Sequence, residues 1–159
     1  MGLTATVYCD CLERGRLTVP PHRDGFVCVE PSGARSPVSV PTLEASVEFD
    51  TWNDSACIHK GGELLWRRIG NIAFVATLRT ALEADGVSLP VLLDKFLYDG
   101  VHCGDWIVYE DVLTLAEEAK ALREIRLDAA DAHECLVRFR VNLDDLLEAA
   151  LSVRKPIEF

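Results

Sequence analysis

The stretch "TATVYCDC", residues 4–11, contains the clearest strand pattern of the sequence. Its apolar and polar side chains alternate with a period of two, so successive side chains would point to opposite faces of a sheet. One face would carry Ala5, Val7, Cys9 and Cys11, and the other Thr4, Thr6, Tyr8 and Asp10. We predict a strand with one buried face, and we expect the short apolar run 26–29 to be its antiparallel partner.

Most of the remaining chain is predicted to be helical. The strongest helix covers residues 71–84, with Asn71 as a typical N-cap and Gly86 just past its end. Because its first two turns are apolar on nearly all sides, we expect it to be buried at the centre of the core. Four other helices are expected: a short one after Thr42, one over residues 89–98 after Ser88, one from Glu110 or Asp111 to about residue 126, and one capped by Asp128 or Asp131.

Short strands and loops are predicted to connect these helices. Residues 30–41, "EPSGARSPVSVP", are rich in proline, serine and glycine, which indicates a mobile loop or insertion. Gly61 and Gly62 indicate a hairpin turn between two short extended segments, residues 106–109 a brief strand, and the tail after Pro156 an edge strand. The predicted fold class is therefore α+β, a single domain with a small, mainly antiparallel sheet packed against four or five helices around the 71–84 helix.

The charge of the chain restricts its partners. Its 159 residues have the size of one domain, and 26 acidic against 16 basic residues give a formal net charge of -10. Such a surface repels phosphate backbones and anionic lipid headgroups, so we expect neither nucleic acid nor a membrane as partner. A basic protein partner fits this charge better.

Further sequence features restrict the expected cellular location of the protein and the cofactors that it could bind. The N-terminus lacks the basic and apolar regions of a signal peptide, so we expect a cytoplasmic protein with reduced cysteines. The longest apolar run, residues 72–76, is too short to span a bilayer. The sequence contains neither G-x-G-x-x-G nor G-x-x-x-x-G-K-[ST], and we predict no cofactor.

Six cysteines and four histidines raise the question of a metal site. No C-x-x-C or H-x-x-x-H spacing occurs, although structural zinc usually draws its ligands from such spacings. Two pairs, Cys9 with Cys11 and Cys57 with His59, would each share a face of an extended segment. We expect no metal, and only these four residues keep a metal site open as an alternative.

A thiol-dependent enzyme is a further alternative. Cys103 or Cys57 would be its nucleophile, His59 or His102 its base, and Asp105 or Asp10 would orient that base. Such groups are assembled in space from distant segments, so the sequence neither supports nor excludes them. Free cysteines are among the most buried residues, and packing in the core is their expected role.

Recognition of another protein is the function that we expect from the sequence. The three tryptophans lie in or beside predicted loops, and tryptophan is enriched among the residues that dominate protein interfaces. Carboxylates near them would orient a basic partner and speed its association. The predicted contact residues are Trp52, Asp54, Glu63, Trp66, Asp99, Asp105 and Trp106. We thus expect a non-enzymatic, acidic, cytosolic protein that binds a basic protein, as an immunity protein or inhibitor binds a nuclease toxin; the sequence predicts no oligomeric state.

Overall fold

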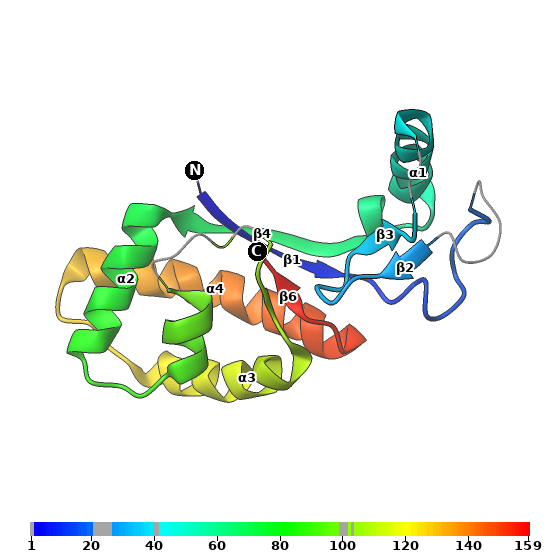
Figure 1. Cartoon of the computed structure of the whole chain (residues 1–159). Helices are drawn as coiled ribbons and strands as arrows, with labels where there is room; N and C mark the ends of the chain where they lie inside the picture. Colours follow the sequence, from blue (N-terminus) through cyan, green and yellow to red (C-terminus); the bar gives the residue numbers. More distant parts are fainter. Residues whose placement is uncertain (1, 21–26, 40–41, 99–101, 103) are drawn as a thin grey trace.

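The chain folds into an antiparallel sheet with helices on one face, and this α+β architecture confirms the predicted fold class (Figure 1). The computed structural model describes residues 2–20, 27–39, 42–98, 102 and 104–159. The main sheet has the order β4-β1-β6-β5. Its strands are β1 (Gly2–Tyr8), β4 (Glu63–Asn71), β5 (Trp106–Ile107) and β6 (Ile157–Glu158). A second, two-stranded sheet consists of β2 (Val27–Val29) and β3 (Arg35–Pro37).

Strand β1 lies between two neighbours in the main sheet. Its alternating pattern has the predicted effect, because Ala5 and Val7 are fully buried on the inner face. The predicted partner, the run 26–29, is wrong: β1 pairs with β4 along its whole length and with β6 on its other side. Strand β2 pairs with β3 instead, since a nearby partner in sequence costs little loop-closure entropy.

The expectation that residues 30–41 form a loop without regular structure is wrong at β3. The turn between β2 and β3 is closed by the backbone N–H of Glu30, which donates to the Ala34 carbonyl at 2.8 Å. Gly33 has a φ of 94° in this turn, a conformation that glycine adopts without strain. The glycine and serine that suggested a loop therefore form a tight hairpin.

Five helices lie in the described part of the chain, in addition to a short 3₁₀ turn, η1 (Lys60–Gly62). They are α1 (Leu43–Ser55), α2 (Ile72–Ala84), the short π-helix η2 (Leu92–Phe96), α3 (Tyr109–Glu124) and α4 (Ala130–Val153). Two predicted N-caps are confirmed: Thr42 Oγ1 accepts from the Ala45 N–H at 3.2 Å, and Asn71 Oδ1 accepts from the Phe74 N–H at 2.8 Å.

The predicted cap of the last helix, Asp128 or Asp131, is wrong. Helix α4 begins after Ala129, whose side chain makes no capping hydrogen bond, and Asp131 lies inside the first turn. A carboxylate there still interacts favourably with the helix dipole, which explains why the sequence resembles a cap. No helix in the described part of the chain is long and apolar enough to cross a membrane.

The core lies between the inner face of the sheet and helices α2, α3 and α4. Helix α4 is its central helix, because it contacts β1, β4, α2 and α3 and contains more buried residues than α2 or α3. Leu136, Phe139 and Leu143 of α4 are at most 1% exposed. The Phe139 ring packs edge-on against Phe96 of η2, with 5.6 Å between the ring centroids. The apolar stripe of α4 continues to Ala150, so this one helix contributes to the core along nearly its whole length.

Helix α2 is not buried on all sides, and its predicted place at the centre of the core is wrong. Val75, Leu78 and Leu82 are buried, whereas Ile72 is 75% exposed. The helix packs against the rest of the protein from one side only, so the apolar residues on its other side remain in contact with water.

The predicted edge strand after Pro156 is also wrong. Strand β6 lies inside the sheet, with Glu158 opposite Thr6 of β1 and Ile157 opposite Ile107 of β5. The two-residue strand β5 takes the edge instead. The C-terminal strand β6 therefore pairs with the N-terminal strand β1 in one sheet.

Replacing Phe139 with alanine is expected to destabilise the protein strongly. Truncating a buried aromatic side chain in a close-packed core lowers the free energy of unfolding by about 3–5 kcal/mol. Val141→Ala, on the same helix but at a side chain that is 59% exposed, is the matched control. It should change the free energy by less than about 0.5 kcal/mol. Urea unfolding followed by circular dichroism measures both, and equal small losses would contradict the core position of Phe139.

Candidate metal centre

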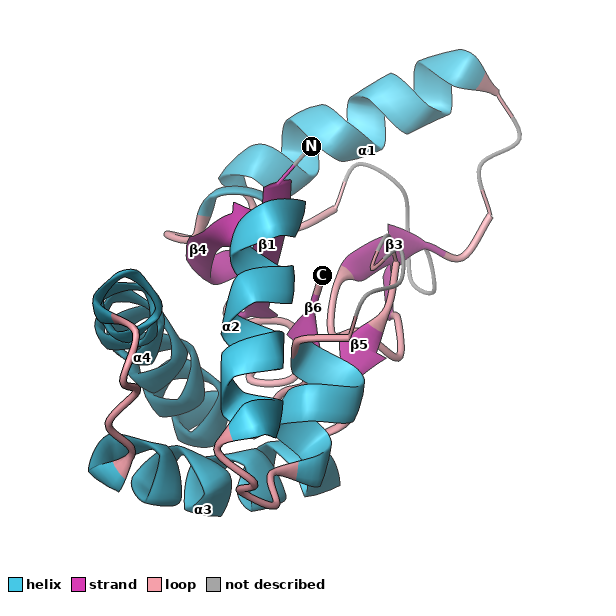
Figure 2. Cartoon of the chain, turned by 90° about the vertical axis from the view of Figure 1, so that its left-hand side faces the viewer, coloured by secondary structure: helices cyan, strands magenta, loops and turns pink. Residues whose placement is uncertain are grey.

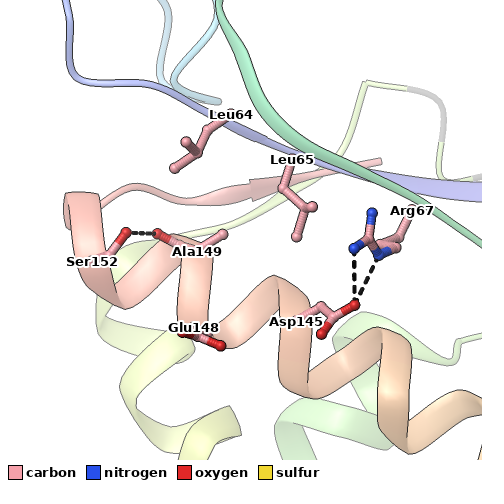
Figure 3. A pocket seen from close by; sticks show the side chains of 7 residues that line it. All are labelled: Leu64, Leu65, Arg67, Asp145, Glu148, Ala149 and Ser152. Atoms are coloured by element: carbon pink, nitrogen blue, oxygen red, sulfur yellow. Dashed lines mark hydrogen bonds and ion pairs between the residues drawn. The ribbon is translucent and has the colours of Figure 1, made fainter. Parts of the chain in front are cut away.

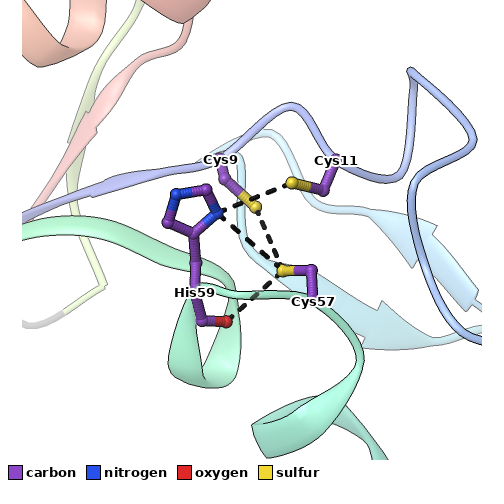
Figure 4. Close-up of side chains that lie close together, drawn as sticks. All are labelled: Cys9, Cys11, Cys57 and His59. Carbon is purple, nitrogen blue, oxygen red and sulfur yellow. Dashed lines mark hydrogen bonds between the residues drawn. The ribbon is translucent and has the colours of Figure 1, made fainter.

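Cys9, Cys11, Cys57 and His59 lie together in the structure, although 48 residues separate the two pairs in sequence (Figure 4). Cys9 and Cys11 follow the end of β1, and Cys57 and His59 lie between α1 and β4. We call these four residues the centre. The structure thus brings together the four residues for which the sequence left a metal site open.

Strand pairing accounts for this convergence. In the antiparallel ladder of β1 and β4, Tyr8 stands opposite Glu63, so the residues after β1 run beside the residues before β4. The backbone N–H of Cys9 continues the ladder by donating to the Gly62 carbonyl at 2.8 Å. The main sheet therefore delivers both pairs to one place.

The distances within the centre match the size of a tetrahedral metal site. Cys9 Sγ lies 3.8 Å from Cys57 Sγ, and Cys11 Sγ lies 3.5 Å from His59 Nδ1. All four potential ligand atoms are within 4.8 Å of one another. Bond lengths of about 2.3 Å to sulfur and 2.0–2.1 Å to nitrogen give tetrahedral edges of about 3.8 Å between two sulfurs and about 3.5 Å between sulfur and nitrogen. The Cys9–Cys57 and Cys11–His59 separations are therefore close to the edges of such a tetrahedron.

Two glycines shape the turn that presents His59. The prediction of a hairpin at Gly61 and Gly62 is wrong, because helix α1 precedes this turn and the partner of β4 is β1. The Gly62 N–H donates to the His59 carbonyl at 3.0 Å, and Gly62 has a φ of 81°. A Cβ atom at Gly62 would also lie 2.6 Å from Arg35 Nη2. Glycine at this position therefore provides both the left-handed backbone and the space for Arg35.

Arg35 of β3 reaches the centre from the second sheet. The residue is only 8% exposed. Its Nη2 lies 3.8 Å from Cys57 Sγ and 3.5 Å from the Asn53 carbonyl, and its guanidinium carbon lies 5.9 Å from the centre of the Trp52 ring. Sequence reasoning missed Arg35, since it lies in the segment predicted as a loop and no motif singles it out.

The thiols of the centre differ in acidity. Burial, together with the neighbouring Cys9 and Cys57 thiols, raises the pKa of Cys11 to about 12. Burial also acts to raise the pKa of Cys57, but a hydrogen bond with the His59 backbone, the Cys9 thiol and the positive charge of Arg35 outweigh it and lower that pKa. Cys57 is therefore a thiolate at lower pH than Cys11.

Among the described residues, the predicted catalytic residues His102 and Asp105 are not part of the centre. Cys103 lies outside the described residues. His102 packs against Tyr98 and Phe159, with ring centroids 4.0 and 4.9 Å away, and burial lowers its pKa. Asp105 accepts a hydrogen bond from the Tyr98 hydroxyl. The described contacts of His102 and Asp105 are thus with aromatic neighbours rather than with a thiol of the centre.

The prediction that the three tryptophans lie in or beside loops is wrong for Trp52 and Trp66, whereas Trp106 is the first residue of a strand and directly follows a loop. Trp52 lies in α1, Trp66 in β4 and Trp106 in β5. The sheet accounts for the last two, because aromatic side chains suit a pleated, half-exposed surface.

The predicted carboxylates occupy separate places. Asp54 lies on α1 and pairs with Lys60 at 3.6 Å, and Glu63 is exposed at the start of β4. Asp105 lies just before β5, and Asp99 lies outside the described residues. The described carboxylates of this set, Asp54, Glu63 and Asp105, therefore lie on three different segments of the chain.

Two of the tryptophans nevertheless share one face of the main sheet. Trp66 stands opposite Thr6, Thr6 opposite Glu158, and Glu158 opposite Trp106. Directly opposed residues point to the same side, so these four form a row across the sheet, which we call the outer row. Trp66 is 49% and Trp106 42% exposed. Three strand spacings place the two tryptophans about 14 Å apart.

A shallow pocket lies between β4 and α4 (Figure 3). It is lined by Leu64, Leu65, Arg67, Asp145, Glu148, Ala149 and Ser152. Arg67 donates to Asp145 Oδ2 from Nε at 3.0 Å and from Nη2 at 2.9 Å. The Arg67–Asp145 ion pair therefore links the main sheet to α4, which is a structural role.

Nothing among the known protein families, the curated proteins or the solved structures matches this chain. A function for this chain is therefore inferred from the geometry of the centre.

Iodoacetamide is expected to modify Cys57 before Cys11 in the reduced, metal-free protein at about pH 8, because the thiolate is the reacting form. The lowered pKa of Cys57 increases its thiolate fraction, whereas Cys11, with a pKa of about 12, remains a thiol. Raising the pH should accelerate Cys57 first. Peptide mass spectrometry over time measures both rates, with Cys135 of α4 as a reference thiol outside the centre. Faster modification of Cys11 would contradict the assigned order.

Proposed function

We propose that this chain is a zinc-binding protein in which Cys9, Cys11, Cys57 and His59 hold one Zn²⁺. The observation that carries the proposal is the approach of these four ligand atoms to within 4.8 Å of one another, at separations close to tetrahedral edges. Thiolate and imidazole are the ligands that zinc prefers in structural sites. Three cysteines and one histidine form one of the common structural sets.

The composition of the centre favours a structural site over a metal-dependent enzyme. Catalytic zinc keeps a position open for water or substrate, usually beside three protein ligands. Here four protein ligands fill the tetrahedron, and Cys9 and Cys11 are each only 5% exposed. The proposed role of the ion is therefore to hold segments of the chain together.

Protein purified under reducing conditions should contain one zinc ion per chain by elemental mass spectrometry. Replacing the zinc with Co²⁺ should give the visible absorption of tetrahedral cobalt and a thiolate charge-transfer band, since Co²⁺ adopts the geometry that the ligands impose. Cys11→Ser and Cys57→Ser should each lose most of the metal, because each removes a thiolate ligand.

Cys28→Ser and Cys135→Ser are the matched controls, since both change a free cysteine outside the centre. They should retain the full zinc content. Octahedral cobalt spectra, a chain without stoichiometric zinc, or equal metal loss in the controls would each contradict the proposed site.

A second function, recognition of a basic protein partner, is favoured by the outer row. Trp66 and Trp106 are half-exposed on one sheet face with Glu158 between them, and the chain has a formal net charge of -10. Half-exposed tryptophans supply large contact area, and the net negative charge of the chain would attract a basic partner. This function is compatible with a structural zinc ion.

The double variant Trp66→Ala/Trp106→Ala is expected to weaken binding to a physiological partner by at least about 30-fold, the loss typical of interface hot spots. The partner is first cross-linked to the full chain in cells, identified and purified, and binding is then titrated at two salt concentrations. The wild-type complex should weaken as salt increases, because surface charge attraction is screened. Val137→Ala on α4, also at an exposed apolar residue, is the control. An acidic partner, or unchanged affinity of the double variant, would exclude this function.

A further inference from the structure

The described residues 9–20, 27–39 and 42–62 form a lobe that extends from one end of the sheet and contains α1, the hairpin of β2 and β3, and η1 (Figures 1 and 2). We call it the lobe, and the remaining chain the body. The buried apolar residues described in the lobe are Cys9, Cys11, Phe49 and Ala56. The buried residues of the main hydrophobic core all lie in the body. The described part of the lobe therefore has almost no apolar core of its own.

A segment of this size needs a substitute for the missing core. Small folding units that bury little apolar surface commonly depend on disulfides or metal ions, because burial alone does not offset the loss of chain entropy. Two of the four buried apolar residues in the lobe are cysteines of the centre. The proposed zinc ligands thus occupy the position where a core would otherwise lie.

The centre also joins the two ends of the lobe. Cys9 and Cys11 are at its start, and Cys57 and His59 are near its end. A metal bond between such distant segments closes a long loop and removes much of the conformational freedom of the unfolded segment. Next to this closure, the Thr18 N–H donates to the Ala56 carbonyl at 2.9 Å.

Arg35 provides independent support, because its buried charge needs a partner. Among the described residues, Nε and Nη1 of Arg35 have no hydrogen-bond partner. Its Nη2 lies 3.8 Å from the Cys57 sulfur, one of the proposed ligand atoms. Three thiolates and one Zn²⁺ together have one net negative charge, which would balance the guanidinium. A buried charge is tolerated when it is paired in this way.

We propose that the zinc centre and Arg35 together form the core of the lobe, so that the lobe folds around the metal while the body folds around its own apolar core. This inference rests on the proposed zinc site and adds its consequence for the fold. Arg35 acts as a positioning residue: it compensates the charge of the centre and ties the hairpin of β2 and β3 to it. The lobe is therefore a metal-dependent folding unit attached to a metal-independent one.

Hydrogen–deuterium exchange on the full chain tests this division. Removing the metal with a chelator under reducing conditions should accelerate backbone exchange in the described residues 9–20, 27–39 and 42–62 by more than about tenfold, as local unfolding does. The amides of Cys9 and Thr18 are direct reporters, since both donate within or next to the centre. Amides of α3 and α4 should keep their protection, and adding Zn²⁺ back should restore the protection of the lobe.

Arg35→Met tests the role of the buried charge, because it removes the guanidinium and keeps an unbranched apolar side chain in place of the arginine methylenes. It should lower zinc affinity by about 10–100-fold, the usual effect of removing a group that supports metal ligands. Arg35→Lys, which retains the charge, should recover part of that loss. Arg16→Met removes a positive charge from an exposed position in the same lobe and should leave the affinity unchanged. Competition with a chromophoric chelator measures all three variants.

The outcomes separate the two proposals. A chain that binds no stoichiometric zinc refutes the site itself. A chain that binds zinc but keeps the lobe protected after chelation refutes the metal-dependent lobe and leaves the site intact. Loss of protection throughout α3 and α4 as well would refute the independent body. Equal zinc affinity in Arg35→Met and Arg16→Met would refute the role of Arg35.

Discussion

The antiparallel pairing of β1 with β4 is the interaction on which the rest of the structure depends. On its inner face it buries Ala5 and Val7 against the helices, and at its end it places Cys9 beside Gly62. The same ladder thus supports two different kinds of stabilising interaction. Apolar burial holds the body together on one side, and the ligands of the proposed zinc ion meet at the end. A shift of one residue in this register would move every β1 side chain to the opposite face.

The chain divides its stabilising interactions unevenly between body and lobe. Helix α4 supplies a continuous apolar stripe to the body, whereas the lobe has few buried apolar residues and a concentration of thiols. Arg35 fits this division because a buried guanidinium is unfavourable in an apolar core but favourable beside an anionic metal–thiolate group. Gly62 serves the same arrangement, since any side chain there would contact Arg35. The centre therefore includes residues that provide charge and space as well as ligands.

Sequence patterns predicted local structure well where it depends on neighbours along the chain. The caps at Thr42 and Asn71 were predictable because a capping side chain bonds to a backbone group three residues away. Predictions that required knowledge of packing were less successful. Helix α2 has the more apolar sequence, yet α4 occupies the centre, because burial depends on what surrounds a helix. Strand β6 is internal for the same reason: β5 pairs with its free side.

The sequence by itself determined the α+β class, the alternating face of β1, most helix positions and the pairing of potential ligands into Cys9 with Cys11 and Cys57 with His59. These depend on periodicity and on short-range backbone geometry. Only the tertiary structure decided that the two pairs meet and that Arg35 joins them. It also decided that Trp66 and Trp106 share one sheet face. The physical reason is that strand pairing and side-chain packing join residues far apart in sequence, and no local pattern records which distant segment will be the partner.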